Sequence, residues 1–262
     1  MKTARKNQQS LKMFLLLAQK RLSLLAVLLL LLNVPSGFGQ DNWELYRNAI
    51  KDAAVYNRNK VLPLRLLQPE AGRVQVVTFT SYAYKVGPYH VPAGRFIWVT
   101  PDGEVQGICR QFNLQGAQLT LRLAQLIGLP PNTQNTSMVV FSVPVDRIFR
   151  PTPDPNPMTI YPCAASEMSQ CGNQLPANVP AEFKTFFINQ ALSAYRIGQT
   201  EQENGYPWTH LGYTYNWTPY AASKYGASEY VITPDTEVMV ISRTPSDQYC
   251  APLQVAPAQK QK

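Results

Sequence analysis

The sequence predicts an α+β fold: a single compact domain with about five strands and three helices, and one disulfide-bearing loop insertion. Stretches in which apolar residues recur with a helical period are interspersed with short stretches rich in β-branched and aromatic residues. Neither kind recurs at a fixed interval, which argues against a solenoid. Four cysteines and a proline-rich stretch indicate a long irregular segment between the regular elements.

The first 39 residues have the pattern of a signal peptide. They contain six basic residues and no acidic residue, an apolar segment at residues 22–32, and the small residues Gly37 and Gly39 before Gln40. The apolar segment has 11 residues, short of the roughly 20 that span a bilayer. We therefore expect cleavage and export to the periplasm or the extracellular space. The alternative is an uncleaved N-terminal anchor.

The charge of the remaining chain does not point to a polyanionic partner. The whole chain carries a net charge of +8, but the leader holds six of its 24 Lys and Arg residues, which leaves 18 basic against 16 acidic residues. A net charge this small gives no support for binding nucleic acid or an anionic membrane. We expect one globular domain at residues 40–250, a disordered tail at residues 251–262, and no stable membrane span once the leader is removed.

The first half of this domain begins with a helix. Asp41 and Asn42 can cap it, and its apolar stripe comprises Trp43, Tyr46, Ile50 and Ala53/Ala54. Residues 74–80 and 95–100 have the composition of strands, and residues 84–94 between them form a turn-rich connection. A second helix presents Leu119, Leu123, Leu126 and Ile127 on one face, and Gly128 and Pro130-Pro131 end it.

The second half begins with a third strand at residues 138–143. Alternate prolines at residues 150–157 exclude regular structure, so residues 150–178 are predicted to be a loop insertion on the domain surface. Pro180 lies in the first turn of a third helix with Phe183, Phe187, Ala191 and Tyr195 aligned, and Gly198 can end it. Residues 229–233 and 237–242, joined by the tight Pro234-Asp235 turn, are predicted to form a terminal hairpin.

The cysteines are predicted to form disulfides. An even number after an export signal favours pairing over metal binding. Cys163 and Cys171 enclose a short polar loop, which favours pairing them and leaves Cys109 for Cys250, although three pairings are formally possible. No CxxC or HExxH motif occurs and the two histidines are far apart in sequence, so no metal is expected. No phosphate-binding or dinucleotide-binding glycine motif occurs, so no cofactor is expected.

The best candidate site is the aromatic loop at residues 205–217 together with Glu229, where the next strand begins. Aromatic faces with a few polar groups suit a flat polar ligand, and a carboxylate can stabilise the cation that forms when a glycosidic or N-glycosidic bond breaks. Glu229 is therefore the candidate catalytic residue; the alternative is a strand residue that faces solvent. The candidate ligand-stacking residues, which could instead pack the loop onto the core, are Trp208, Tyr213, Tyr215 and Trp217.

Five segments in order, at residues 93–104, 125–132, 138–149, 205–213 and 225–232, together resemble NAD glycohydrolases of the tuberculosis necrotizing toxin type. The five segments together contain 49 residues. The resemblance implies an ADP-ribosyltransferase-like fold and places Glu229 at the family's catalytic glutamine. Lys85 stands where the family has an arginine for the dinucleotide phosphates, and it lacks the bidentate fork of that arginine. Arg95, in the Gly-Arg-Phe segment, is a further candidate for binding substrate.

Two functions are consistent with these residues. The first is hydrolysis of an N-glycosidic bond in an NAD-like dinucleotide, with Glu229 stabilising the ribosyl cation. The second is a non-catalytic secreted or envelope protein that binds a partner through the same aromatic loop. A concave site that combines Glu229, an aromatic wall and a basic residue favours the enzyme, whereas Glu229 in bulk water favours the binding protein.

Overall fold

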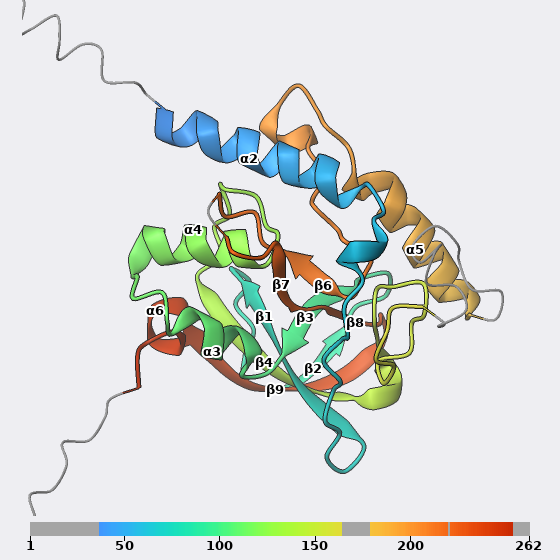
Figure 1. Ribbon diagram of the computed structural model, residues 1–262. Helices are drawn as coiled ribbons and strands as arrows, with labels where there is room; N and C mark the ends of the chain where they lie inside the picture. Colours follow the sequence, from blue (N-terminus) through green and yellow to red (C-terminus); the bar gives the residue numbers. More distant parts are fainter. Residues whose placement is uncertain (1–36, 164–178, 220, 254–262) are drawn as a thin grey trace, which may run out of the picture. The chain divides into compact units, whose positions relative to one another are not determined.

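The computed structural model describes residues 37–163, 179–219 and 221–253 (Figure 1). Most of the predicted leader, Cys171 and the tail beyond residue 253 lie outside the described residues. The chain divides into two units, at residues 1–41 and 42–262, and all the strands belong to the second unit. Within the described ranges, no helix has the length and apolar character needed to cross a bilayer.

The α+β prediction is confirmed, but the described residues form five helices and nine strands, more than the three and about five predicted. The helices are α2 (Gly37–Ala53), α3 (Glu104–Cys109), α4 (Gly116–Leu126), α5 (Ala181–Ala194) and α6 (Ser246–Tyr249). The strands are β1 (Arg73–Thr80), β2 (Gly87–Val91), β3 (Ile97–Pro101), β4 (Ser137–Pro144), β5 (Ile148–Phe149), β6 (Tyr213–Tyr215), β7 (Tyr225–Ser228), β8 (Tyr230–Ile232) and β9 (Thr236–Pro245). Short 3-10 turns include η2 (Val145–Arg147) and η4 (Glu201–Glu203).

Seven strands form one sheet in the order β2-β9-β4-β1-β3-β8-β5, and β6 and β7 form a separate pair. Three strands therefore separate β8 from β9, although only residues 233–235 connect them. In a flat sheet the two strands would lie about 19 Å apart, at about 4.8 Å for each of four spacings. Four Cα steps reach at most about 14 Å. The sheet must therefore bend so that β8 and β9 approach each other.

The predicted terminal hairpin is consequently wrong, because β8 pairs with β3 and β5 whereas β9 pairs with β2 and β4. The β1–β3 pairing, which joins the β8 side of the sheet to the β9 side, is limited to Val76–Pro101 and Val77–Thr100. Arg147 holds the connecting turn, since its guanidinium donates to the carbonyl of Pro234 (2.8 Å) and to the hydroxyl of Thr236 (3.1 Å). The tight turn at residue 234 was identified correctly, but it joins two halves of a bent sheet.

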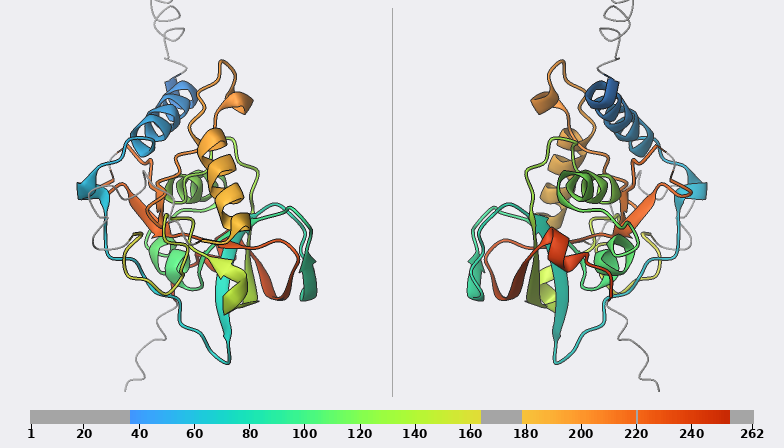
Figure 2. Two further views of the ribbon diagram at one scale, coloured as in Figure 1. Left: turned by 90° about the vertical axis from the view of Figure 1, so that its right-hand side faces the viewer. Right: turned by 90° about the vertical axis from the view of Figure 1, so that its left-hand side faces the viewer.

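The inner face of the bent sheet forms the main core, with buried residues that include Val76, Phe141, Tyr230 and Val240. Helices α3, α4 and α6 pack on β1 and β4 from the opposite face (Figures 1 and 2). Helix α5 packs its phenylalanines on β3, β5 and β8. The apolar stripe predicted for α2 is confirmed, with Tyr46 and Ile50 fully buried. The capping prediction is wrong, because α2 begins at Gly37 and Asp41 and Asn42 lie inside it.

Strand β2 lies in the segment predicted to be a turn-rich connection. It pairs with β9 at the edge of the sheet, where Pro88 needs no second partner strand. The third helix ends at Ala194, four residues before Gly198, and Pro180 precedes it as the N-cap. Strands β5, β6 and β7 have two to four residues each, too short to show a periodic pattern.

The segment after β5 begins in the interior, whereas the insertion was predicted to lie on the surface. Arg150 is fully buried: its Nη2 donates to the carbonyl of Arg65 (3.0 Å) and to the hydroxyl of Tyr230 (2.7 Å), and its guanidinium lies 4.6 Å from the centre of the Tyr230 ring. The proline-rich segment therefore begins at a residue, Arg150, that is fixed in the core.

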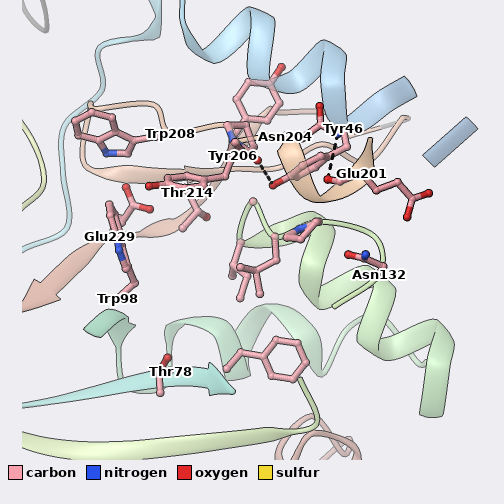
Figure 3. Close-up of a pocket in the computed structure, with 18 of the residues that line it drawn as sticks. Tyr46, Thr78, Trp98, Asn132, Glu201, Asn204, Tyr206, Trp208, Thr214 and Glu229 are labelled. Carbon is pink, nitrogen blue, oxygen red and sulfur yellow. Dashed lines mark hydrogen bonds between the residues drawn. The ribbon is translucent and has the colours of Figure 1, made fainter. Parts of the chain in front are cut away.

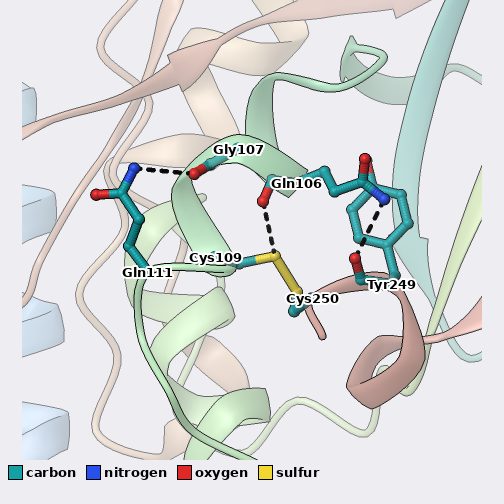
Figure 4. The surroundings of a disulfide bond; sticks show 6 residues. All are labelled: Gln106, Gly107, Cys109, Gln111, Tyr249 and Cys250. Atoms are coloured by element: carbon teal, nitrogen blue, oxygen red, sulfur yellow. Dashed lines mark hydrogen bonds between the residues drawn. A yellow bond between two sulfur atoms is a disulfide. The ribbon is translucent and has the colours of Figure 1, made fainter. Parts of the chain in front are cut away.

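The predicted disulfide between Cys109 and Cys250 is present and joins the end of α3 to the residue after α6 (Figure 4). The pairing predicted for Cys163 involves Cys171, which lies outside the described residues.

Candidate functional site

Glu229 lies alone between two strands that belong to different sheets. Strand β7 pairs with β6, and β8 pairs with β3 and β5, so the chain changes sheets at this residue. Its backbone N–H donates to the carbonyl of Gly212 (3.0 Å). Two nearby side chains pack away from the cavity: Ala227 packs under α4, and Tyr230 packs inside the bent sheet. The side chain of Glu229 is left to face a cavity.

The cavity has a volume of about 590 Å³, within the range of small-molecule sites. It is bounded by α2, β1, β3, β6, the turn after α4 and residues 201–208. Seven aromatic residues line it: Trp43, Tyr46, Phe79, Trp98, Tyr206, Trp208 and Tyr215. Figure 3 shows Glu229 at the same end of the cavity as Trp98 and Trp208, with Glu201 on the far side. The site is therefore a largely aromatic pocket with one acid at its inner end.

The carboxyl group of Glu229 has no hydrogen-bond donor among the described residues. The residue retains some exposed surface because it faces the cavity, but its Oε2 atom is buried and unpaired. Burial raises the pKa of this carboxyl well above its ordinary value of 4.5, since a charged carboxylate loses its water without gaining a partner. A group of this kind can donate a proton near neutral pH, or serve as the counter-charge to a cationic ligand.

Trp208 forms the wall beside Glu229. The indole is fixed by Tyr195, whose ring stacks on it at 6.2 Å, and by Phe187, whose ring lies edge-on at 4.9 Å. Its Nε1–H is buried and has no acceptor in the part of the chain that the structure describes. Two unpaired buried polar groups, a donor and a carboxyl group, thus lie at one end of the same cavity (Figure 3). Buried polar groups without hydrogen-bond partners are uncommon in native proteins, and a ligand that bonds to both groups would account for them.

The cavity brings together Glu229, Trp208 and Tyr215 from the set of candidates selected on sequence grounds. Trp217 instead packs on Tyr46 of α2, and its Nε1 donates to the carbonyl of Leu129 (2.9 Å). Tyr213 lines a second cavity of about 410 Å³, and its hydroxyl donates to the carbonyl of Lys60 (2.7 Å).

The two basic candidates lie elsewhere. Lys85 and Arg95 are exposed and belong to the connections that flank β2, and neither is among the residues that line the cavity. Within the described part of the chain, the lining contains no Lys or Arg side chain. The sequence analysis required an acid, an aromatic wall and a basic residue for a dinucleotide enzyme. The cavity has the acid and the aromatic wall, and its described lining lacks the basic residue.

Several lining residues were missed on sequence grounds. Trp43 and Tyr46 were assigned to the apolar stripe of a helix, and Trp98 to a predicted strand. A strand or helix side chain can pack in the core and still border a cavity, and periodicity does not distinguish the two. Tyr206 is the exception, because the Gly-Tyr-Pro-Trp sequence at residues 205–208 marks it as part of the aromatic loop.

Comparisons of the chain with models of protein families, with curated proteins and with solved structures find no match. The fold and the site define the chain as an α+β domain with an acid-bearing aromatic cavity.

Proposed function

We propose that this protein is an exported hydrolase that cleaves the N-glycosidic bond of an NAD-like compound, with Glu229 as the catalytic residue. The observation that carries the proposal is the unpaired, buried carboxyl group of Glu229 inside an aromatic cavity of ligand size. The leader-like residues 1–39 and the disulfide support export. The resemblance to NAD glycohydrolases supports the choice of bond.

The chemistry requires a negative charge beside the sugar carbon that becomes cationic. The bond between the ribose carbon and the ring nitrogen breaks, and its electron pair neutralises the positively charged nicotinamide ring. Water then adds to the ribosyl cation and releases a proton to solvent. In this scheme ionised Glu229 stabilises the cation at short range, where the low dielectric of the cavity strengthens the attraction.

Glu229 must be ionised to act in this way, although burial favours its neutral form in the empty cavity. A positively charged ring favours the ionised carboxylate, because opposite charges within a few ångströms lower an acid's pKa. The faces of Trp98, Trp208 and Tyr206 add cation–π attraction to such a ring. Binding of the cationic base would thus generate the charge that the reaction needs.

The phosphates of a dinucleotide would lie outside this cavity. The described residues that line it offer no basic side chain to pair with them, and Glu201 and Glu229 would repel them. We therefore propose that the cavity holds the nicotinamide and ribose portion of the substrate. We therefore expect the protein to cleave nicotinamide riboside in addition to NAD.

The test is nicotinamide release from NAD and from nicotinamide riboside by the purified mature protein. We expect Glu229→Ala to lower kcat by about a hundredfold or more, because no polar side chain then remains beside the ribosyl cation. Glu182→Gln, on the exposed side of α5, is the matched control and should retain full activity. Absence of release by the wild-type protein, or release that is insensitive to Glu229→Ala, would refute the proposal.

A second candidate function is binding of an organic cation without turnover. The observation that favours it is that Glu229 has no hydrogen-bonded base or acid beside it in the described structure to activate water. Calorimetry with N-methylnicotinamide, a cation with no bond to cleave, distinguishes the two functions. Tight binding that is lost in Glu229→Gln, together with no turnover of NAD or nicotinamide riboside, would support the binding protein.

A further inference from the structure

The orientation of Glu229 depends on a second glutamate that does not line the cavity. The Oε1 atom of Glu104 accepts hydrogen bonds from the backbone N–H of Ser228 (3.0 Å) and from the Ser228 hydroxyl (3.2 Å). The next N–H along the chain, that of Glu229, is bound by the carbonyl of Gly212 (3.0 Å). Both amides at the point where the chain changes sheets are therefore held.

These bonds determine the direction of the Glu229 side chain. Successive residues of an extended chain point to opposite sides. With Ser228 directed toward Glu104, Glu229 must point the other way, into the cavity. No strand pairing holds Glu229 itself, because β7 ends at Ser228 and β8 begins at Tyr230.

Glu104 is attached to a fixed part of the molecule. It begins α3, whose Val105 and Cys109 are buried under the sheet. The other end of α3 is joined to the end of α6 by the disulfide to Cys250, and Gln106 Nε2 donates to the carbonyl of Tyr249 (3.2 Å) (Figure 4). The backbone at Glu104 is therefore held by contacts that do not involve the strand that carries Ser228.

We infer that Glu104 is a positioning residue, which holds the carboxyl group of Glu229 inside the aromatic cavity through its hydrogen bonds to Ser228. The inference rests on the proposed function for its kinetic consequence only. Its structural consequence, that the surroundings of Glu229 change when Glu104 is altered, can be measured whether or not the protein is an enzyme.

The inference requires the hydrogen-bond acceptor of Glu104 rather than its charge. The N–H and the hydroxyl of Ser228 are neutral donors, and the nearest ion-pair atom, Nη1 of Arg65, is 4.0 Å from Oε2. A glutamine retains an Oε1 acceptor at the same position. Glu104→Gln is therefore expected to preserve the orientation of Glu229, and Glu104→Ala to lose it.

The experiment follows the titration of Glu229 by NMR in protein labelled with carbon-13 at the glutamate carboxyl, with Glu229→Gln identifying the signal. In Glu104→Ala we expect the pKa of Glu229 to shift down toward that of an exposed glutamate. The kcat for nicotinamide release should fall by about a hundredfold, with a much smaller change in KM, because the aromatic walls remain. Gln111→Ala, which removes only a local bond to Gly107, is the control and should change neither quantity.

Glu104→Asp is the replacement variant if Glu104→Ala does not fold. It keeps the charge, but its side chain is one methylene shorter, so its acceptor oxygen no longer reaches Ser228. It should shift the titration in the same direction. A titration of Glu229 that is unchanged in Glu104→Ala or Glu104→Asp would overturn the inference, as would equal effects of Glu104→Gln and Glu104→Ala. If the wild-type protein releases no nicotinamide, the proposed function fails and the titration still decides the role of Glu104.

Discussion

At the scale of single residues, Glu229 combines burial with the lack of a partner. Most buried carboxyl groups are paired, because an unpaired charge in a protein interior is costly. Burial raises the pKa of Glu229 well above its ordinary value, which favours the uncharged form of its carboxyl group. Its neighbour Trp208 also leaves a buried N–H unpaired. Such a concentration of unsatisfied groups reduces stability and is typical of a site shaped for a ligand.

The pH dependence of stability should show this cost. The native state retains the Glu229 proton at pH values where the unfolded chain releases it, so stability falls as pH rises above about 4.5 and through the raised pKa. Glu229→Gln cannot ionise. We therefore expect the free energy of unfolding of the wild-type protein, relative to Glu229→Gln, to decrease as pH increases. Urea unfolding at a series of pH values measures this difference.

Glu203 should affect the pH dependence of stability in the opposite direction to Glu229. Its exposed carboxylate accepts the backbone N–H groups of Thr200 and Gln199, and these bonds lower its pKa. The stability it contributes is present above its ordinary pKa and is lost as pH falls through the lowered value. Relative to Glu203→Gln, the wild-type protein should lose stability toward acid. Equal pH dependence in the two comparisons would contradict the assignment of Glu229 as a buried, neutral acid.

At the scale of elements, strand β6 lines the cavity, and its pair with β7 depends on close packing against α4. Thr214 Oγ1 donates to the carbonyl of Leu126 (2.9 Å) and accepts the N–H of Ala227 (2.9 Å). Gly226 lies directly against this contact, where an added Cβ would be 2.1 Å from Thr214 Oγ1 and 2.2 Å from the Leu126 carbonyl. Only glycine fits there without moving a strand or the end of a helix.

We therefore expect Gly226→Ala to destabilise the protein by about 3 kcal/mol, because the methyl group meets backbone as well as a side chain. Gly107→Ala is the matched control: Gly107 lies in α3, and nothing is within 4 Å of its added Cβ. That change should be neutral or stabilising by up to about 1 kcal/mol, as expected for alanine in a helix. Thermal and urea unfolding of the two variants provide the test.

At the scale of the whole domain, the bent sheet and the disulfide connect segments that are distant in sequence. Cys109 and Cys250 are 141 residues apart, and their bond joins α3 in the first half of the domain to the segment after the last strand. In the chain-entropy account, a loop of that length restricts the unfolded chain strongly. The same bond fixes α3, which carries Glu104.

Removing this disulfide should therefore affect both stability and the site. We expect Cys109→Ser combined with Cys250→Ser to lower the free energy of unfolding by about 4 kcal/mol, measured by urea unfolding. We also expect a lower pKa of Glu229 in the folded double variant, because the disulfide no longer fixes α3 and Glu104. The single variant Thr185→Ala, which removes an exposed hydroxyl bonded to the carbonyl of Ala181 within α5, is the control for handling and should match the wild-type protein.

The sequence by itself determined much of the local structure and favoured the disulfide between Cys109 and Cys250. The helix α4 and the buried stripe of α2 follow from the period of their apolar residues, which reports the face that each helix buries. The strands β1, β3 and β4 follow from their β-branched and aromatic composition. It also identified the aromatic loop and Glu229 as a candidate site. These features are local, so a short window of the chain contains the information.

Only the tertiary structure decided how these parts combine. The Pro234-Asp235 turn indicates a reversal of the chain but not which strands β8 pairs with, and the structure pairs it with β3 and β5. Glu229 has the same sequence context whether it faces solvent or a cavity. Its burial depends on Trp98, Trp208 and α2, which are brought together from distant segments, and its orientation depends on Glu104, 125 residues earlier in the chain. Long-range packing of this kind leaves no periodic mark in the sequence.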